Sequence, residues 1–195
     1  MCHKMKIDIW EVINAASTKP FGFMPFYPGP GVGGHCIPKD PLYLYWKAKS
    51  FGFSSRFIRL ASDVISYMPE YVAVRIEEAL SLRGLKIKGA KILVVGVTYK
   101  KDVKDLRKSP SIDMIKSLEI KGAKVFYSDP LIPYLKIGQI DLKSVILKKS
   151  SLTKFDCVVI ATDHSLIDYK YLLNNSKLIF DTRNVYKGSN NNKVV

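Results

Sequence analysis

The sequence Lys91-Ile92-Leu93-Val94-Val95-Gly96-Val97 determines the architecture of this chain. Its run of aliphatic residues predicts a strand that is buried on both faces. Three further apolar runs follow, with room for helices between them, at 124–130, 157–161 and 178–181. Continuous apolar strands that alternate with helices are typical of a parallel sheet covered on both sides. We therefore predict an α/β fold for residues 87–188.

Two helices are predicted between these strands. The first covers about 110–121, with Ser109 as its N-cap. The second begins at Ser165, which forms a capping-box pattern with Asp168. We expect the neighbouring His164 to help to start this helix rather than to perform chemistry.

The N-terminal half, residues 1–86, reads as a helical segment. Apolar residues recur at helical spacing over 7–16. From 55 to 83 a long amphipathic pattern predicts a helix of roughly 40 Å at about 1.5 Å per residue. A helix of this length typically connects two domains or forms a subunit interface. The long helix therefore predicts a homodimer.

Residues 19–41 form a loop that contains six prolines and five glycines. Because the loop is rich in aromatic and aliphatic residues, we expect it to be ordered and to bind or catalyse. Asp40 is predicted as the N-cap of the next helix, Pro41 as its first residue and Gly52 as its end.

Cys36 precedes this predicted helix. The free amides and dipole of a helix N-terminus favour the thiolate, as does the charge of Lys39. We interpret Cys36 as a reactive nucleophile, and Cys2 and Cys157 as neutral. Although Cys36 adjoins His35, the sequence has no Cys-x-x-Cys or comparable ligand spacing, so we predict no metal site.

The ends of the predicted strands carry cations. Lys100, Arg107 and Arg183 lie at or just after strand ends, where open parallel sheets bind ligands, so they are candidates for binding phosphate. Each of them is also compatible with a solvated surface position. The first strand lacks the Gly-x-Gly-x-x-Gly turn of a dinucleotide site, and bulky residues follow Gly96. We do not expect NAD to bind at this turn.

The 195 residues carry a net charge of +14. Only six of the 31 cations are arginines, and acids interrupt the densest basic stretch, at 100–108. This distribution favours a lysine-rich solvated surface, or a polyanionic small substrate, over nucleic-acid binding. The composition excludes dominant disorder, and no apolar run is long enough to span a bilayer. Three scattered cysteines and no secretion signal predict a cytoplasmic protein.

Four motifs in order resemble the UDP-glucose/GDP-mannose dehydrogenase family. Pro28-Gly-Pro-Gly-Val-Gly-Gly-His-Cys-Ile-Pro-Lys-Asp-Pro41 resembles its catalytic loop. The second motif is Gly96-Val-Thr-Tyr-Lys-Lys-Asp-Val-Lys-Asp-Leu-Arg-Lys-Ser-Pro110, and the others are Tyr127-Ser-Asp-Pro130 and Phe180-Asp-Thr-Arg183. The residues 17–27 are similar to members that oxidise UDP-N-acetylhexosamines, UDP-N-acetylglucosamine first.

This resemblance implies an NAD-dependent four-electron oxidation of a sugar C6 alcohol to a carboxylate, through a thiohemiacetal and a thioester on cysteine. Cys36 matches the nucleophile and Asp40 the acid that assists water and hydrolysis. Arg107 matches a residue that reaches toward NAD. The residues that match substrate-binding positions are Phe26, Tyr27, Gly33, Lys100 and Arg183. Lys19 lies near the position of an arginine that crosses to a neighbouring subunit in glucose-oxidising members, and it is left unassigned.

The resemblance also implies three parts: a central helical segment at 1–86, a Rossmann-like UDP-binding domain at 87–188 and a flexible tail at 189–195. The family's N-terminal NAD-binding domain is not represented in the sequence. We therefore expect a C-terminal fragment that binds UDP-sugar weakly and does not turn over. The alternatives are a UDP-N-acetylmannosamine or UDP-glucose dehydrogenase, a non-catalytic nucleotide-sugar binding module and a nucleic-acid-binding protein.

Overall fold

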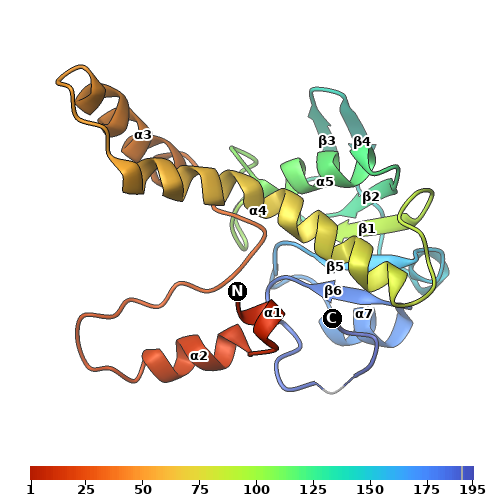
Figure 1. Cartoon of the computed structure of the whole chain (residues 1–195). Coiled ribbons are helices and arrows are strands. Elements are labelled where there is room, and N and C mark those ends of the chain that lie inside the picture. Colours follow the sequence, from red (N-terminus) through yellow and green to blue (C-terminus); the bar gives the residue numbers. More distant parts are fainter. Residues whose placement is uncertain (190) are drawn as a thin grey trace.

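The computed structural model describes residues 1–189 and 191–195. Its N-terminal half is helical, as predicted. The helices are α1 (Cys2–Met5), α2 (Ile9–Ala16), α3 (Cys36–Lys49) and α4 (Arg56–Ser81). In Figure 1 the segment around α2 and the pair α3–α4 project from the body of the molecule on the same side.

The body is built on a four-stranded parallel sheet, which confirms the predicted α/β fold. Its strands are β1 (Lys91–Val95), β2 (Lys124–Ser128), β5 (Cys157–Ile160) and β6 (Ile179–Asp181), in the order β2-β1-β5-β6. In the register, Leu93 lies opposite Phe126 on one side and Val158 on the other. The strand that predicts the fold from sequence thus lies inside the sheet.

Side chains of β1 alternate between two hydrophobic cores. Ile92 and Val94 pack with α4 and with α5 (Pro110–Ile120). Leu93 and Val95 pack on the opposite face with α6 (Lys149–Leu152) and α7 (Tyr169–Asn175). Because both faces are covered, every core position of β1 is apolar.

A short antiparallel hairpin, β3 (Tyr134–Ile137) and β4 (Ile140–Lys143), is an element that the sequence patterns did not predict. Its four-residue strands mix apolar residues with lysines, which hides the alternation.

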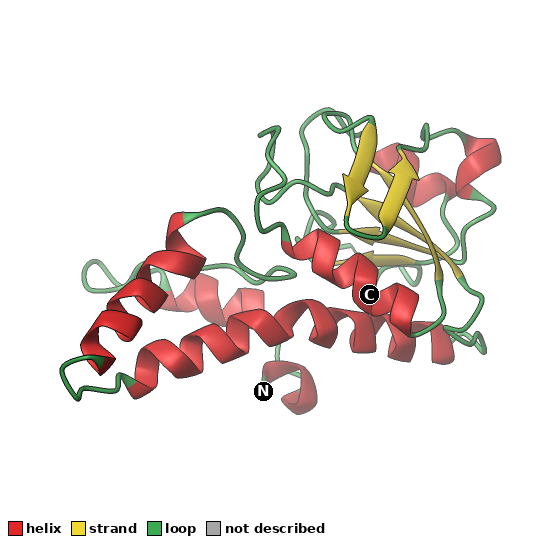
Figure 2. Cartoon of the chain, turned by 90° about the horizontal axis from the view of Figure 1, so that it is seen from above, coloured by secondary structure: helices red, strands yellow, loops and turns green. Residues whose placement is uncertain are grey.

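The long helix α4 joins the two halves. Its buried residues lie between Pro69 and Leu80, where it packs on the sheet and α5. Its first half extends beyond the body beside α3, as Figure 2 shows. The proline does not interrupt the helix, which runs continuously for 26 residues.

Two predicted helix starts are wrong. α3 begins at Cys36 rather than after an Asp40 N-cap. Pro38 lies in its first turn, where proline is tolerated, and Pro41 lies inside the helix. α7 begins at Tyr169 with Asp168 as its N-cap, whose side chain accepts from the Tyr171 N–H. Ser165 is not part of this cap.

The C-terminal residues differ from the predicted flexible tail. Val194 forms a parallel bridge with Ile179, and the Asp181 N–H donates to Val195 O at 2.9 Å. This end of the chain therefore lies along β6.

Candidate functional site

The candidate site lies at the carboxyl ends of β1 and β5. The chain leaves β1 toward β2 on one side and returns to β5 on the other, so the strand order reverses between β1 and β5. Ligands of open α/β sheets bind at such a reversal. The loop 96–109 follows β1, and residues 161–164 follow β5.

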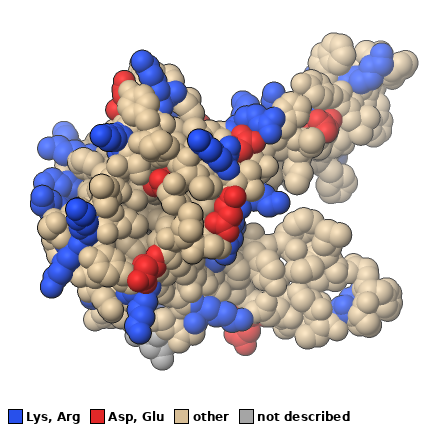
Figure 3. Space-filling model, turned by 180° about the vertical axis from the view of Figure 1, so that it is seen from behind, with Lys and Arg blue, Asp and Glu red and all other residues tan. Residues whose placement is uncertain are grey.

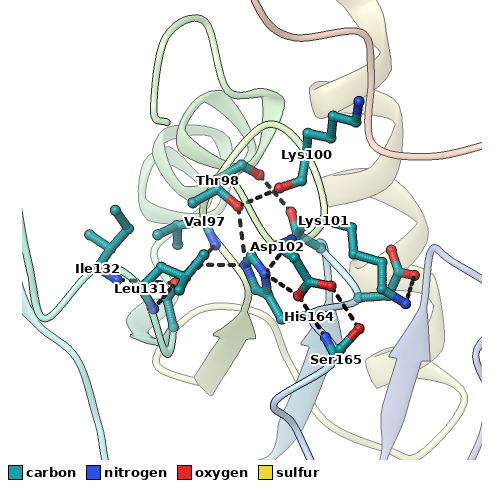
Figure 4. Close-up of polar contacts among 12 residues, drawn as sticks. Val97, Thr98, Lys100, Lys101, Asp102, Leu131, Ile132, His164 and Ser165 are labelled. Atoms are coloured by element: carbon teal, nitrogen blue, oxygen red, sulfur yellow. Dashed lines mark hydrogen bonds and ion pairs between the residues drawn. The ribbon is translucent and has the colours of Figure 1, made fainter. Parts of the chain in front are cut away.

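Arg183 and the loop that carries Lys100 are joined through one carboxylate. Arg183 Nε donates to Asp163 Oδ1 at 3.0 Å, and Lys101 Nζ lies 3.6 Å from Asp163 Oδ2. Lys100 is exposed, and in Figure 4 its side chain points away from the polar cluster beneath the loop. Two of the predicted phosphate-binding cations, Lys100 and Arg183, therefore lie on segments that meet at Asp163.

The glycine loop 29–34 packs against this edge of the sheet. A Cβ on Gly33 would lie 2.5 Å from Tyr99 Cβ and 2.8 Å from Lys108 O, so only glycine fits there. The Gly34 N–H donates to Arg107 O at 3.0 Å. A Cβ on Gly29 would lie 2.7 Å from Arg183 Nη1. The loop that ends at Cys36 is thus in direct contact with the cation-bearing segments.

Cys36 and Asp40 are both exposed and lie four residues apart in α3. This spacing places them on one face of the helix, one turn apart. Cys36 is the first residue of the helix, among backbone amides that have no partner inside it. The corrected helix start therefore brings the two predicted catalytic groups together and keeps the thiol at the positive end of a helix dipole.

Arg107 lies near Cys36 and has an exposed guanidinium. Its side chain donates to Asp105 at 2.7 to 3.1 Å. Asp105 raises the pKa of Arg107, and the nearby Cys36 adds to this rise. In turn, hydrogen bonds from Arg107 lower the pKa of Asp105.

The turn after β1 does not fit NAD. The Val97 N–H, which would face a pyrophosphate, donates to Asp129 Oδ2 at 2.7 Å. A Cβ on Gly96 would lie 2.3 Å from Thr162 O, so this glycine is packed against backbone and leaves no approach for a ligand. Arg107 remains the one residue that the sequence assigns to the dinucleotide.

Phe26 and Tyr27 lie on the projecting segment after α2 (Figure 1). The Tyr27 ring stacks on Trp10 with centroids 5.1 Å apart, and its hydroxyl donates to Asn14 Oδ1 at 3.3 Å. Phe26 is 76% exposed. Lys19, on the same segment, lies over the Phe21 ring at 5.3 Å. Of the two predicted wall residues, the structure packs Tyr27 against α2 and leaves Phe26 exposed.

His164 is a residue whose role sequence reasoning missed. It is fully buried, and it hydrogen-bonds to Thr98, Asp102 and Asp129 (Figure 4). No local pattern in the sequence signals this role, because Thr98, Asp102 and Asp129 are all distant from the histidine along the chain. Cys157, which the sequence analysis interprets as neutral, is buried, and burial raises the pKa of its thiol to about 12.

A cavity of about 700 Å³ lies between α3, α4 and α5. Its walls are mainly apolar and include Ile37, Phe57, Ile65 and Pro110. Cys36 does not line it. Within residues 1–189 and 191–195, no three His, Cys, Asp or Glu side chains are grouped to hold a metal ion.

The charged residues are distributed as the sequence predicted. Figure 3 shows Lys and Arg scattered over the body with Asp and Glu between them, while the projections are mostly uncharged. In the described part of the chain, no helix has the length and apolar character to cross a membrane.

Two domain models of one family match the chain. Residues 1–65 match the central domain of the UDP-glucose/GDP-mannose dehydrogenase family, and residues 93–188 match its UDP binding domain.

Named relatives carry related descriptions. The chain is 34% identical to UDP-N-acetyl-D-mannosamine dehydrogenase of Methanococcus maripaludis over 97% of its own length and 43% of the relative's. It is 38% identical to UDP-N-acetyl-D-glucosamine 6-dehydrogenase of Pseudomonas aeruginosa, over 66% of its own length and 30% of the relative's. The solved UDP-D-ManNAc dehydrogenase of Pyrococcus horikoshii superposes with a TM-score of 0.81 at 29% identity, over 96% of this chain and 43% of that one. The chain therefore spans less than half of these relatives.

Proposed function

The chain belongs to the UDP-glucose/GDP-mannose dehydrogenase family, and from this premise we propose that it is the UDP-binding and cysteine-bearing part of a nucleotide-sugar 6-dehydrogenase. Lys100 and Arg183 bind the uridine diphosphate part of the substrate. Cys36 faces the sugar carbon. The observation that carries the proposal is the contact of Gly33 and Gly34 with the loop after β1, because this contact joins the thiol to the UDP-binding edge.

NAD, when bound, accepts a hydride in each of the two oxidations that convert a C6 alcohol into a carboxylate. Arg107 is the residue of this chain that we assign to it, and we propose that its other contacts lie in the part of the relatives' length that the chain does not span.

Cys36 holds the sugar carbon between the two oxidations. Its thiolate adds to C6 of the aldehyde, and the aldehyde oxygen takes up a proton. After the second oxidation, C6 is a thioester carbon. Water then attacks C6, the Sγ–C6 bond breaks, and the carboxylate and the free thiolate result. A thiolate suits both steps because it is a good nucleophile and an adequate leaving group.

Asp40 assists the hydrolytic step. It lies one helical turn from Cys36 on the same face of α3. A carboxylate at this distance can orient the attacking water and accept its proton.

The proposed substrate is a UDP-N-acetylhexosamine. The sequence of residues 17–27 favours the glucosamine epimer, whereas the relative that covers 97% of the chain is named for the mannosamine epimer. The acetamido sugar is common to both. We therefore propose this substrate class, with UDP-N-acetylglucosamine and UDP-N-acetylmannosamine as the epimers to compare.

A chimera tests the activity. The 195 residues replace the matching segment of the Methanococcus maripaludis relative, and NADH formation is measured with UDP-N-acetylglucosamine, UDP-N-acetylmannosamine and UDP-glucose. We expect turnover of a UDP-N-acetylhexosamine and a loss of about 10³-fold or more in Cys36→Ala. A folded chimera that binds NAD and UDP but oxidises none of the three sugars would contradict the proposal. If the chimera does not fold, UDP-sugar binding to the chain itself is measured instead.

We also propose that the chain forms a homodimer through the projecting pair α3–α4. Its surface exposes an apolar set that is unusual for a monomer: Tyr43, Leu44, Trp46, Phe51, Phe53, Phe57, Leu60 and Val64.

A further inference from the structure

His164 lies at the centre of a polar cluster under the candidate site. Its side chain has no exposed surface. Its hydrogen-bond partners come from the loops after β1 and β2. Asp102, after β1, is 62 residues away in sequence, and Asp129, after β2, is 35 residues away. A fully buried imidazole with partners from two other strands is a specific arrangement rather than a surface residue.

The hydrogen bonds define which ring nitrogen carries the proton. His164 Nδ1 accepts the Asp102 N–H at 3.0 Å, so neutral His164 has its hydrogen on Nε2. Nε2 lies 3.0 Å from Thr98 Oγ1 and 3.2 Å from Asp129 Oδ2. The Thr98 hydroxyl donates its hydrogen to Lys100 O at 3.0 Å, so the Thr98 oxygen accepts from Nε2. Both nitrogens are therefore engaged, and His164 has no free atom for acid–base chemistry.

Asp129 fixes the ring from the other side. Its carboxylate accepts the N–H groups of Val97, Leu131 and Ile132 at 2.7 to 3.1 Å. Burial would raise the pKa of Asp129, but the hydrogen bonds from His164 and from the backbone outweigh burial and lower it. This carboxylate is a rigid anchor between β1 and β2.

The cluster holds the backbone on both sides of Lys100. His164 binds the Thr98 hydroxyl before it and the Asp102 N–H after it, and the Thr98 hydroxyl binds Lys100 O itself. Asp102 has a φ of 57°, a left-handed conformation that is uncommon for non-glycine residues and that aspartate adopts more readily than most. Ser165 also holds it, through two hydrogen bonds to the Asp102 carboxylate. Figure 4 shows Lys100 directed outward from this fixed base.

We propose that His164 is a positioning residue for the UDP-sugar site: its two ring nitrogens lock the loop 98–102, and so set the direction of Lys100 and the surface on which Gly33 and Gly34 rest. This proposal rests on the proposed function. It assigns His164 no contact with the substrate.

Three variants distinguish the contributions of the two ring nitrogens. His164→Leu removes both hydrogen bonds. His164→Asn keeps an oxygen acceptor near the Nδ1 position, and His164→Gln keeps an amide donor near the Nε2 position. The matched control is Leu172→Ala, because Leu172 is also fully buried but packs in the core on the far face of the sheet.

The first readout is the affinity of the chain for UDP, followed by NMR titration at concentrations up to several millimolar. We expect His164→Leu to weaken UDP binding about tenfold or more, with His164→Asn between it and the unsubstituted chain. Leu172→Ala should bind within about twofold, at a temperature where it is folded. Equal affinities for His164→Leu and Leu172→Ala would overturn the proposal.

The second readout is amide hydrogen exchange, which does not require UDP. In His164→Leu the amides of Asp102 and Gly34 should exchange at least tenfold faster relative to that of Val94, inside the sheet. In Leu172→Ala the three amides should change together. If His164→Leu leaves the ratio unchanged, His164 is merely structural. If the unsubstituted chain binds no UDP, the proposed function loses its support, and the exchange ratio still decides whether His164 positions the loop.

Discussion

At the level of single residues, the site depends on how closely the backbone of residues 29–34 approaches the loop after β1. Gly33 lies against Tyr99 and Lys108, and Gly34 donates to the backbone of Arg107. These contacts bring the N-terminus of α3, with Cys36, to the carboxyl edge of the sheet. The Cys36 thiol is therefore placed by backbone packing rather than by its own side-chain contacts.

Gly33→Ala should separate the glycine loop, residues 29–34, from the loop after β1. The new Cβ would overlap Tyr99 and the Lys108 carbonyl, and overpacking of this kind costs about 1–3 kcal/mol. We expect faster amide exchange at Gly34 in a hydrogen-exchange experiment. Gly52→Ala controls for a backbone cost without overlap, since its φ of 76° disfavours alanine but nothing lies within 4 Å of its Cβ position. Unchanged protection of Gly34 would show that the loop does not depend on this contact.

Asp129→Asn should change the acid dependence of stability. The folded-state pKa of Asp129 lies below its ordinary value of 3.8, so the unfolded chain binds more protons near that pH. The stabilisation is present above about pH 4 and is lost as the pH falls through the lowered pKa.

Urea unfolding at pH 7, 4 and 3 measures this effect. The stability difference between the unsubstituted chain and Asp129→Asn should shrink below about pH 4. Asp113→Asn, on the exposed side of α5, controls for the loss of a carboxylate. A difference that stays constant from pH 7 to pH 3 would be incompatible with an ionised, hydrogen-bonded Asp129.

The sequence predicted some residues of the candidate site and missed another. Cys36, Asp40 and the cations could be selected because each lies in a local motif. His164 could not, because its partners Thr98 and Asp129 are distant in sequence and only the folded sheet brings them together. A lone histidine after a strand gives no local signal of that network.

At the level of elements, α4 has two different halves. From Pro69 to Leu80 it is buried against the sheet and α5. Before Pro69 it exposes large apolar residues beside α3. Its amphipathic pattern is continuous along both halves, so the periodicity predicted the helix and its apolar face but not which half the body of the chain covers.

Substitutions in the two halves should differ in their effect on folding. Ile76→Ala removes a fully buried side chain and should lower the free energy of unfolding by about 2–5 kcal/mol. Val64→Ala, at a position that is 52% exposed, should change it by less than about 0.5 kcal/mol in the monomer. Urea denaturation checks both values. Similar losses at the two positions would mean that the first half of α4 is covered.

The exposed half of α4 should control association. Phe57→Glu places a charge in the apolar set of α3–α4 and should shift the chain from dimer to monomer in light scattering after size exclusion. Leu82→Glu is a close match, because Leu82 is also 86% exposed but follows the buried half of the helix. Two variants with the same mass in solution would contradict a dimer through this surface.

Elements were predictable where their pattern was long or strongly apolar. The four parallel strands and α4 and α5 are of this kind. The hairpin β3–β4 was missed because its strands are four residues long and partly charged. The start of α3 was misplaced because the sequence predicts Pro41 as the first helical residue, with Pro38 in the loop before it, although both lie within the helix.

At the level of the whole molecule, two projections that carry few charged residues extend from a body with scattered cations (Figure 3). The chain spans 43% of the Methanococcus relative and contains matches to its family's central and UDP-binding domains. At the turn after β1, the N–H groups of Gly96 and Val97 donate to Ser128 O and Asp129 Oδ2. These observations support the proposal that these residues bind the UDP-sugar and do not by themselves carry out hydride transfer.

The purified 195-residue chain should form no NADH with any UDP-sugar. The reason is that Arg107 alone does not make a dinucleotide site, while the turn after β1 is closed by Asp129 and Thr162. Absorbance at 340 nm measures the product. Cys36-dependent NADH formation by the chain would require a dinucleotide site that the residues described do not show.

Protection of a single thiol tests most directly whether Cys36 and the UDP-binding edge form one site. The alkylation rates of Cys36 and Cys2 are measured by mass spectrometry, alone and with millimolar UDP, UDP-N-acetylglucosamine or UDP-N-acetylmannosamine. Cys2 is the internal reference, and Cys157 is buried. We predict that at least one UDP-N-acetylhexosamine slows alkylation of Cys36 several-fold more than UDP does, while Cys2 is unaffected. Equal rates at Cys36 with and without nucleotide sugars that bind the chain would contradict a shared site.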